Sequence, residues 1–224
     1  MSIRKSMVQL KVNNESPNAY LALTDKDGPG ILVIHAWWGL KPFFKELCDR
    51  LAWQGFMAIA PDLRNGQIAK SIDEAESLMK KSNRQFVNDT VMAAKDFLLN
   101  LPNRHGEKIG VIGFSMGAAW SMEVALSDPD KVAATVLFYG TGAVDFKKVK
   151  SKILGHYSDN DEWEPTEEVR AMETGMKAAG LEVMVHIYPK VGHWFEEGDR
   201  PVYDPLAAKL VRERTFEFLK NNLQ

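Results

Sequence analysis

The stretch Lys108-Ile-Gly-Val-Ile-Gly-Phe-Ser-Met-Gly117 decides the fold. Its first part, Lys108–Phe114, is an apolar run of the kind found in strands that are buried on both faces of a parallel sheet. The pattern Gly113-x-Ser115-x-Gly117 follows it, and a segment with helical spacing of apolar residues comes directly after. Glycines suit these positions because side chains there would strike the strand or the helix in so tight a turn. The stretch therefore predicts a strand, a sharp turn that lifts the Ser115 hydroxyl above the sheet, and a helix with its N-terminus beneath that hydroxyl.

The rest of the chain alternates between short apolar runs and longer segments with helical spacing. The other runs predict strands at Met7–Val12, Ala19–Leu23, Ile31–Ala36, Phe56–Ala60, Val132–Tyr139, Lys152–Tyr157 and Val183–Tyr188. Helices are expected over residues 42–54, 85–101, 116–127, 165–179 and 204–222. The first two runs alternate and can pair as an antiparallel edge, whereas the later runs are continuously apolar. This pattern predicts a doubly wound, mostly parallel α/β sheet with helices on both faces.

The composition of the chain limits the classes of protein to which it can belong. The chain has 224 residues, with 28 lysines and arginines against 30 aspartates and glutamates, which gives a formal net charge of −2. Hydrophobic residues make up 45% and charged residues 26%, as in an ordinary globular protein. The near-neutral balance, without a basic block, argues against nucleic acid or an anionic membrane surface as a partner. No internal repeat or linker divides the sequence, so we expect one domain over residues 1–224, as a monomer or small homo-oligomer.

Signals for targeting, metals and cofactors are also missing from the sequence. No apolar run is long enough to span a bilayer, and residues 1–16 lack the apolar segment of a secretory signal, so we expect a cytoplasmic location. A single cysteine, Cys48, excludes a disulfide framework and a thiolate zinc cluster. No histidine pair has the helical spacing of metal ligands, and Gly28-Pro-Gly30 precedes a strand rather than following one. We therefore expect neither a metal nor a cofactor.

A serine hydroxyl needs an imidazole to take its proton and a carboxylate to orient that imidazole. In a fold of this kind the order along the chain is serine, acid, histidine. Two of the five histidines precede Ser115, and chain order disfavours them. His193 follows the last predicted strand on a loop marked by glycine and proline, where the base belongs. His156, which lies in the strand before an acidic loop, is the alternative.

The candidate acids lie together in that acidic loop. Asp159, Asp161, Glu162 and Glu164 all follow the strand that ends near Tyr157. Most residues of such a run are solvated surface charges. From the residues alone, Asp159 and Asp161 remain equally good candidates for the acid.

With these residues in place, nearly the whole chain resembles the dienelactone hydrolase family of α/β-hydrolases. The resemblance rests on residues 33–39 (VIHAWWG), 60–63 (APDL), 110–117 (GVIGFSMG), 138–140 (FYG), 161–165 (DEWEP) and 188–193 (YPKVGH). The acid of that family lies in a D-x-x-x-P stretch, which implies Asp161, and its base lies in a Gly-His pair, which implies His193. The resemblance also implies that the backbone N–H groups of Trp37 and Met116 form the oxyanion hole.

The chain departs from the family pattern at three positions. Dienelactone hydrolases proper use a cysteine nucleophile, and Ser115 stands in its place. The glutamate associated with that thiol corresponds to Ala36, which is consistent because a neutral Ser–His pair needs no such partner. The arginine with which the family holds a substrate carboxylate falls at Glu197, which would repel a dianionic dienelactone. The resemblance therefore implies hydrolase chemistry rather than the family's own substrate.

Aromatic residues gather at the predicted carboxyl ends of the strands. An apolar-walled cleft with few polar anchors is typical of a small-molecule site. The connecting loops are too short for a separate cap domain, so we expect an open site. The expected substrate contacts are Trp38, Tyr139, Trp163, Trp194 and Phe195.

These features predict a hydrolase that cleaves small to medium carboxylic esters or lactones through an acyl-serine at Ser115. An acyltransferase or perhydrolase would use the same intermediate, and the resolving nucleophile leaves no motif in the sequence. A protein of this fold that only binds a small molecule is the alternative from another class.

Overall fold

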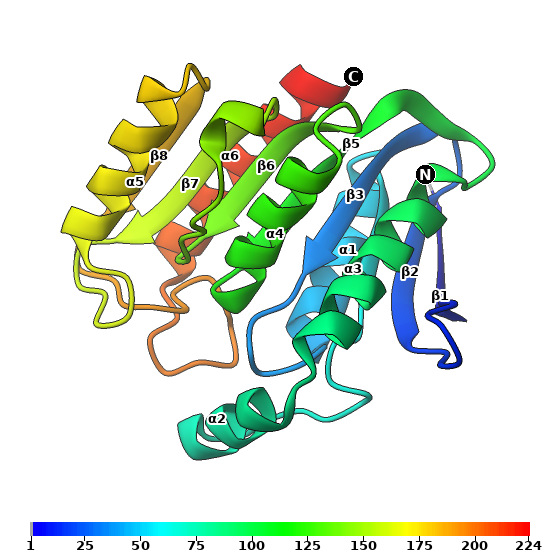
Figure 1. The fold of residues 1–224 in the computed structure, drawn as a ribbon, viewed down its shortest axis with the longest axis horizontal. Coiled ribbons are helices and arrows are strands. Elements are labelled where there is room, and N and C mark those ends of the chain that lie inside the picture. Colours follow the sequence, from blue (N-terminus) through cyan, green and yellow to red (C-terminus); the bar gives the residue numbers. More distant parts are fainter. Residues whose placement is uncertain (1) are drawn as a thin grey trace. The chain divides into compact units, whose positions relative to one another are not determined.

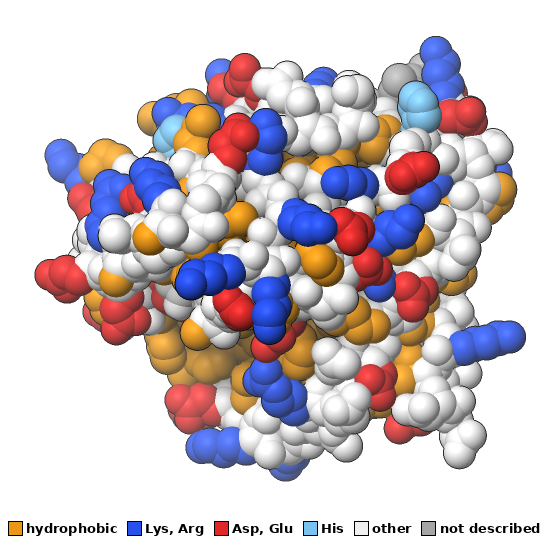
Figure 2. All heavy atoms as spheres, turned by 45° about the horizontal axis from the view of Figure 1, so that its top comes forward, with side chains coloured by type: hydrophobic (Ala, Val, Ile, Leu, Met, Phe, Trp, Pro, Cys, Tyr) orange, Lys and Arg blue, Asp and Glu red, His pale blue; other side chains and the backbone are white. Residues whose placement is uncertain are grey.

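The computed structural model describes residues 2–224, which form two compact units (Figure 1). Unit 1 ends at Ile109 and unit 2 spans Gly110–Gln224. Within residues 2–224, no helix has the length and apolarity needed to cross a membrane. On the face drawn in Figure 2, acidic and basic side chains are interspersed, in keeping with the near-neutral composition.

Unit 1 is built on four strands and the first part of a fifth. Their order is β1-β2-β4-β3-β5. β1 pairs antiparallel with β2, and β2 pairs antiparallel with β4, whereas β3 and β4 are parallel. The predicted antiparallel edge is therefore present. The strands are β1 (Ile3–Gln9), β2 (Asn18–Thr24), β3 (Gly28–Ile34), β4 (Met57–Pro61) and β5 (Arg104–Phe114).

The first strand begins earlier than the sequence pattern predicts. The apolar run Met7–Val12 indicates a strand there, but β1 ends at Gln9. Leu10 and Val12 are buried in the turn that follows, where the Leu10 N–H donates to the Pro17 carbonyl. Burial beneath a turn gives the same apolar pattern as burial in a strand, which explains the shift.

Two helices of unit 1 match the predicted apolar faces. α1 (Pro42–Trp53) packs against β2 and β4, and α3 (Arg84–Leu99) packs against β3 and β4. A third helix, α2 (Ile72–Lys81), was not predicted. It buries only Ala75, and its start is fixed by the Ser71 hydroxyl, which accepts the N–H of Glu74. Capping and charges at both ends replace the apolar face as the source of its stability.

Unit 2 contains the rest of β5 followed by three parallel strands, in the order β5-β6-β7-β8. Figure 1 shows α4 and α5 on one face of these strands and α6 on the other. The carboxyl ends of β6, β7 and β8 lie at one edge, because the strands are parallel. The elements are β6 (Val132–Phe138), β7 (Lys152–Ser158), β8 (Val183–Tyr188), α4 (Met116–Ser127), α5 (Thr166–Ala178), α6 (Pro205–Leu223) and a short 3₁₀ helix (Phe146–Lys148).

Candidate active site

Ser115 occupies a strained turn between β5 and α4. Its φ of 51° places a non-glycine residue in the left-handed region, and it is the residue that caps α4. Its N–H donates to the Phe138 carbonyl at 2.9 Å, and its carbonyl accepts the Ala118 N–H at 2.8 Å. A side chain at Gly113 would collide with the Gly117 carbonyl, so the first glycine of the pattern is a steric requirement. The turn has the strand–turn–helix form that the sequence predicts.

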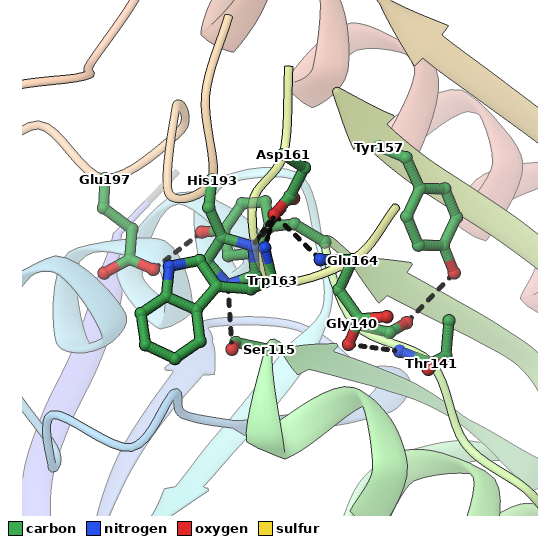
Figure 3. Close-up of polar contacts among 10 residues, drawn as sticks. Ser115, Gly140, Thr141, Tyr157, Asp161, Trp163, Glu164, His193 and Glu197 are labelled. Atoms are coloured by element: carbon green, nitrogen blue, oxygen red, sulfur yellow. Dashed lines mark hydrogen bonds and ion pairs between the residues drawn. The ribbon is translucent and has the colours of Figure 1, made fainter. Parts of the chain in front are cut away.

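His193 links this serine to a carboxylate. Its Nε2 lies 3.0 Å from Ser115 Oγ, and its Nδ1 lies 2.7 and 2.9 Å from the two carboxylate oxygens of Asp161 (Figure 3). The His193 and Asp161 side chains are only 4% and 1% exposed. A carboxylate so close favours a proton on Nδ1, which leaves Nε2 free to accept the serine proton. The structure therefore brings the three residues Ser115, His193 and Asp161 together.

Asp161 is held in place by its own loop. Its Oδ1 accepts the backbone N–H groups of Trp163 at 2.9 Å and Glu164 at 3.0 Å. These two hydrogen bonds fix the direction in which the carboxylate points. The alternative acid, Asp159, has a different partner: its Oδ1 accepts the Lys190 N–H at 2.7 Å. Asp159 thus ties the acidic loop to the loop that carries His193.

His156, the alternative base, lies inside β7 and is fully buried. Its Nδ1 is 2.9 Å from the Tyr188 hydroxyl and its Nε2 is 3.0 Å from Thr215 Oγ1. Burial, together with the charges of His186 and Arg214, lowers the pKa of His156 well below its ordinary value. Both ring nitrogens are engaged with hydroxyls rather than with a carboxylate and the nucleophile.

A second polar pair lies beside His193. Tyr139, at the end of β6, is fully buried and has a φ of 36°. Its hydroxyl donates to Glu197 Oε1 at 2.7 Å, and its ring centroid lies 5.0 Å from that of His193. Burial and the neighbouring Glu197 carboxylate raise the pKa of Tyr139 well above its ordinary value. The sequence gives no signal for this pair, because nothing in its spacing connects residues 58 positions apart.

The loop after β6 is braced against the serine turn. A side chain at Gly140 would strike the Ser115 carbonyl, so the two segments touch. The Gly140 carbonyl accepts the Tyr157 hydroxyl at 3.0 Å, and the Thr141 N–H donates to Glu164 Oε1 at 3.2 Å. Glu164 therefore joins the acidic loop to the loop beside the nucleophile.

The predicted substrate contacts differ in exposure. Trp163 is 45% exposed, and its ring centroid lies 6.4 Å from His193 and 5.9 Å from Trp194. Trp194 is half-buried, whereas Trp38, Tyr139 and Phe195 are at most 1% exposed. Trp163 and Trp194 are thus the members of this set whose surfaces a ligand can reach most readily. Substrate contact by all five residues stays a prediction.

The two predicted oxyanion donors lie on different segments. Met116 is the first residue of α4, so its N–H lies at the positive end of the helix dipole. Trp37 follows β3 in unit 1. There His35 Nδ1 lies 2.6 Å from the Ala36 carbonyl, and Nε2 accepts the Leu63 N–H at 3.1 Å. Holding the Ala36 carbonyl also orients the Trp37 N–H, because both belong to one planar peptide.

Comparison with known proteins places the chain in a family. The model of the dienelactone hydrolase family matches residues 18–223. Protein usf from Aquifex pyrophilus is 36% identical over 227 residues, which cover 97% of this chain and 98% of that protein. A putative carboxymethylenebutenolidase from Aquifex aeolicus is 31% identical over 228 residues, covering 97% and 99%. Residues 2–224 include no separate cap domain.

Solved structures show the same fold. The crystal structure of a putative dienelactone hydrolase from Klebsiella pneumoniae matches with a TM-score of 0.85 and 22% identity, covering 98% of this chain and 99% of that one. A dienelactone hydrolase-like promiscuous phosphotriesterase from metagenomic libraries matches with a TM-score of 0.88 and 21% identity, over 100% of both chains. The chain therefore belongs to the dienelactone hydrolase family and has the α/β-hydrolase fold of ester and lactone hydrolases.

Proposed function

We propose that this chain is a serine hydrolase that cleaves small to medium carboxylic esters or lactones through an acyl-serine intermediate. The observation that carries the proposal is the continuous chain of contacts from Ser115 Oγ through the His193 ring to the Asp161 carboxylate, at 3.0 and 2.7 Å. A buried imidazole with a carboxylate on one nitrogen and a serine hydroxyl on the other is the arrangement that activates serine.

The first half of the reaction forms the acyl-enzyme. Ser115 Oγ attacks the ester carbonyl while His193 Nε2 takes its proton, and Asp161 stays ionised and stabilises the imidazolium. The N–H group of Met116, at the start of α4, holds the oxyanion and contributes about 3–4 kcal/mol. His193 then returns the proton to the departing alkoxide, and the acyl group remains on Ser115.

The second half releases the acid. His193 takes a proton from water, the hydroxide attacks the acyl-serine carbonyl, and Ser115 leaves with the proton that His193 returns. A lactone follows the same steps, except that its alcohol stays attached to the acyl group. The exposed Trp163 and its neighbour Trp194 offer an apolar wall beside His193 for the acyl or aryl group.

The test is turnover of a panel of 4-nitrophenyl alkanoates and simple lactones by the purified chain. The parent should cleave members of the panel, and Ser115→Ala should abolish the reaction. Ser158→Ala is the matched control, because Ser158 is a buried serine at the end of β7 with no hydrogen-bond partner for its Oγ within residues 2–224. Equal turnover by the parent and Ser115→Ala would contradict the proposal. Product analysis with added alcohol or peroxide distinguishes hydrolysis from acyl transfer.

A further inference from the structure

Glu164 places a second carboxylate next to the catalytic acid. Its own N–H donates to Asp161 Oδ1 at 3.0 Å, and its Oε1 accepts the Thr141 N–H at 3.2 Å (Figure 3). Thr141 follows Gly140, which lies against the Ser115 carbonyl. The Glu164 carboxylate is therefore fixed between the acidic loop and the segment beside the nucleophile.

The Glu164 carboxylate interacts electrostatically with two residues of the triad, His193 and Asp161. Burial raises the pKa of Glu164, hydrogen bonds from Thr141 and the charge of His193 oppose the rise, and the Asp161 charge adds to it. The side chain is half-buried, and within residues 2–224 it forms no ion pair with a lysine or arginine. A partly desolvated charge without a cationic partner acts over longer distances than a solvated one.

Glu197 adds a further carboxylate on another side of His193. It is fully buried, and it reaches the histidine through Tyr139, whose ring lies 5.0 Å from the imidazole. A substrate carboxylate that entered beside Ser115 would meet the carboxylates of Asp161 and Glu164 at the acidic loop, with the Glu197 carboxylate behind Tyr139. An uncharged acyl group would meet no such repulsion.

We propose that Glu164 is a specificity-determining residue, which makes the site select uncharged acyl groups over acyl groups that carry a carboxylate. This inference rests on the proposed ester hydrolysis at Ser115. It predicts that this chain disfavours a lactone that carries a free carboxyl group. A substrate of that kind is implied by the name of one relative, the putative carboxymethylenebutenolidase.

The experiment compares two esters with acyl chains of equal length, 4-nitrophenyl pentanoate and mono-4-nitrophenyl glutarate. The spontaneous hydrolysis of each ester is subtracted, and kcat/KM for glutarate is divided by kcat/KM for pentanoate for each enzyme. Comparing this ratio between the parent and a variant cancels the intrinsic reactivity of the esters. The parent should prefer pentanoate by about tenfold or more. Glu164→Gln should raise the ratio of kcat/KM for glutarate to kcat/KM for pentanoate by about fivefold to tenfold.

Glutamine suits the test because its amide oxygen can still accept the Thr141 N–H, and its backbone N–H can still donate to Asp161. Glu162→Gln is the matched control, since Glu162 lies in the same loop, is exposed and carries the same charge. It should change both esters by less than about twofold. Thermal melting of both variants checks that each is folded.

The outcomes separate the inference from the proposed function. Equal efficiency of the parent on both esters, or an equal shift with Glu164→Gln and Glu162→Gln, would overturn the selectivity but leave ester hydrolysis intact. A uniform loss with folded Glu164→Gln would also overturn it, because the residue would then position Asp161 rather than select by charge. No cleavage of either ester by the parent would overturn the proposed function, and this inference with it.

Discussion

Two histidines of unit 2 are both buried and both hydrogen-bonded through each ring nitrogen, yet their surroundings differ. His193 lies on the loop after β8, between the Asp161 carboxylate and the hydroxyl of a serine in a strained turn. His156 lies inside β7, between the hydroxyls of Tyr188 and Thr215. Burial and hydrogen bonding therefore do not distinguish a base from a structural residue. The charge of the partners does.

The physical reason lies in the protonated state. An imidazolium at His193 would face a carboxylate that stabilises it, so the ring can take and return a proton. An imidazolium at His156 would face neutral hydroxyls in a desolvated interior, and the pKa of His156 is accordingly lowered well below its ordinary value. The first histidine is suited to proton transfer and the second to packing.

Matched substitutions of these two histidines should show the largest effect. His193→Gln should lower kcat/KM for a neutral aryl ester by about 10⁴-fold or more, because no group remains to take the serine proton. His156→Gln should leave kcat/KM within about fivefold but lower the free energy of unfolding by about 1–3 kcal/mol, because a buried hydroxyl loses its partner. Steady-state kinetics and urea unfolding measure the two effects.

The reverse pattern would break the comparison. If His156→Gln removed activity in a folded protein and His193→Gln did not, the base would have to be reassigned.

The two aspartates of the acidic loop give the next largest contrast. Asp161→Asn should lower kcat by about 10⁴-fold, because the amide cannot stabilise the imidazolium and favours the wrong tautomer. Asp159→Asn should lower it by less than about threefold, since the amide oxygen can still accept the Lys190 N–H. Kinetics with one neutral ester measure both variants. A larger loss for Asp159→Asn would assign the acid to Asp159.

The buried histidines His35 and His156 should also make the free energy of unfolding depend on pH, an effect smaller than those of the catalytic substitutions. Burial lowers the pKa of His35 to about 4, and it lowers that of His156 well below its ordinary value. The unfolded chain, with a histidine pKa of about 6.5, therefore binds protons that the folded chain excludes. Each histidine contributes stability that is complete above pH ~6.5 and falls by about 1.4 kcal/mol per pH unit below it.

Urea unfolding at pH values from 7.5 to about 5 measures this slope. His156→Gln should reduce the change in the free energy of unfolding with pH by the contribution of one histidine, about 1.4 kcal/mol per pH unit. The same slope in the parent and the variant would show that His156 takes up a proton in the folded state, contrary to the comparison.

Much of the fold follows from the sequence, because most elements have one buried face or two. The helix 116–127 is an example whose residues set both the type and the limits of the element, whereas the run Lys108–Phe114 sets the type and the end of β5 but not its start at Arg104. α2 is not predicted by apolar spacing, because its stability comes from capping and charge rather than from an apolar face. The single-domain organisation stays a prediction.

The candidate site is only partly readable from the sequence. Ser115 and His193 stand out because a glycine-flanked turn and a loop at a strand end restrict where a nucleophile and its base can lie. Asp159 and Asp161 share a loop, and only the direction of their side chains separates them. The Tyr139–Glu197 pair depends on distant segments that meet in the folded chain, so no local pattern predicts it.

The account depends most on the reactivity of one hydroxyl, and a fluorophosphonate probe tests it directly. Intact mass spectrometry of the folded parent should show one adduct per chain, and peptide mapping should place it on Ser115. Ser115→Ala should remain unlabelled, whereas Ser158→Ala should label as the parent does. A folded parent that takes up no probe, or that carries the adduct on another residue, would contradict the central claim.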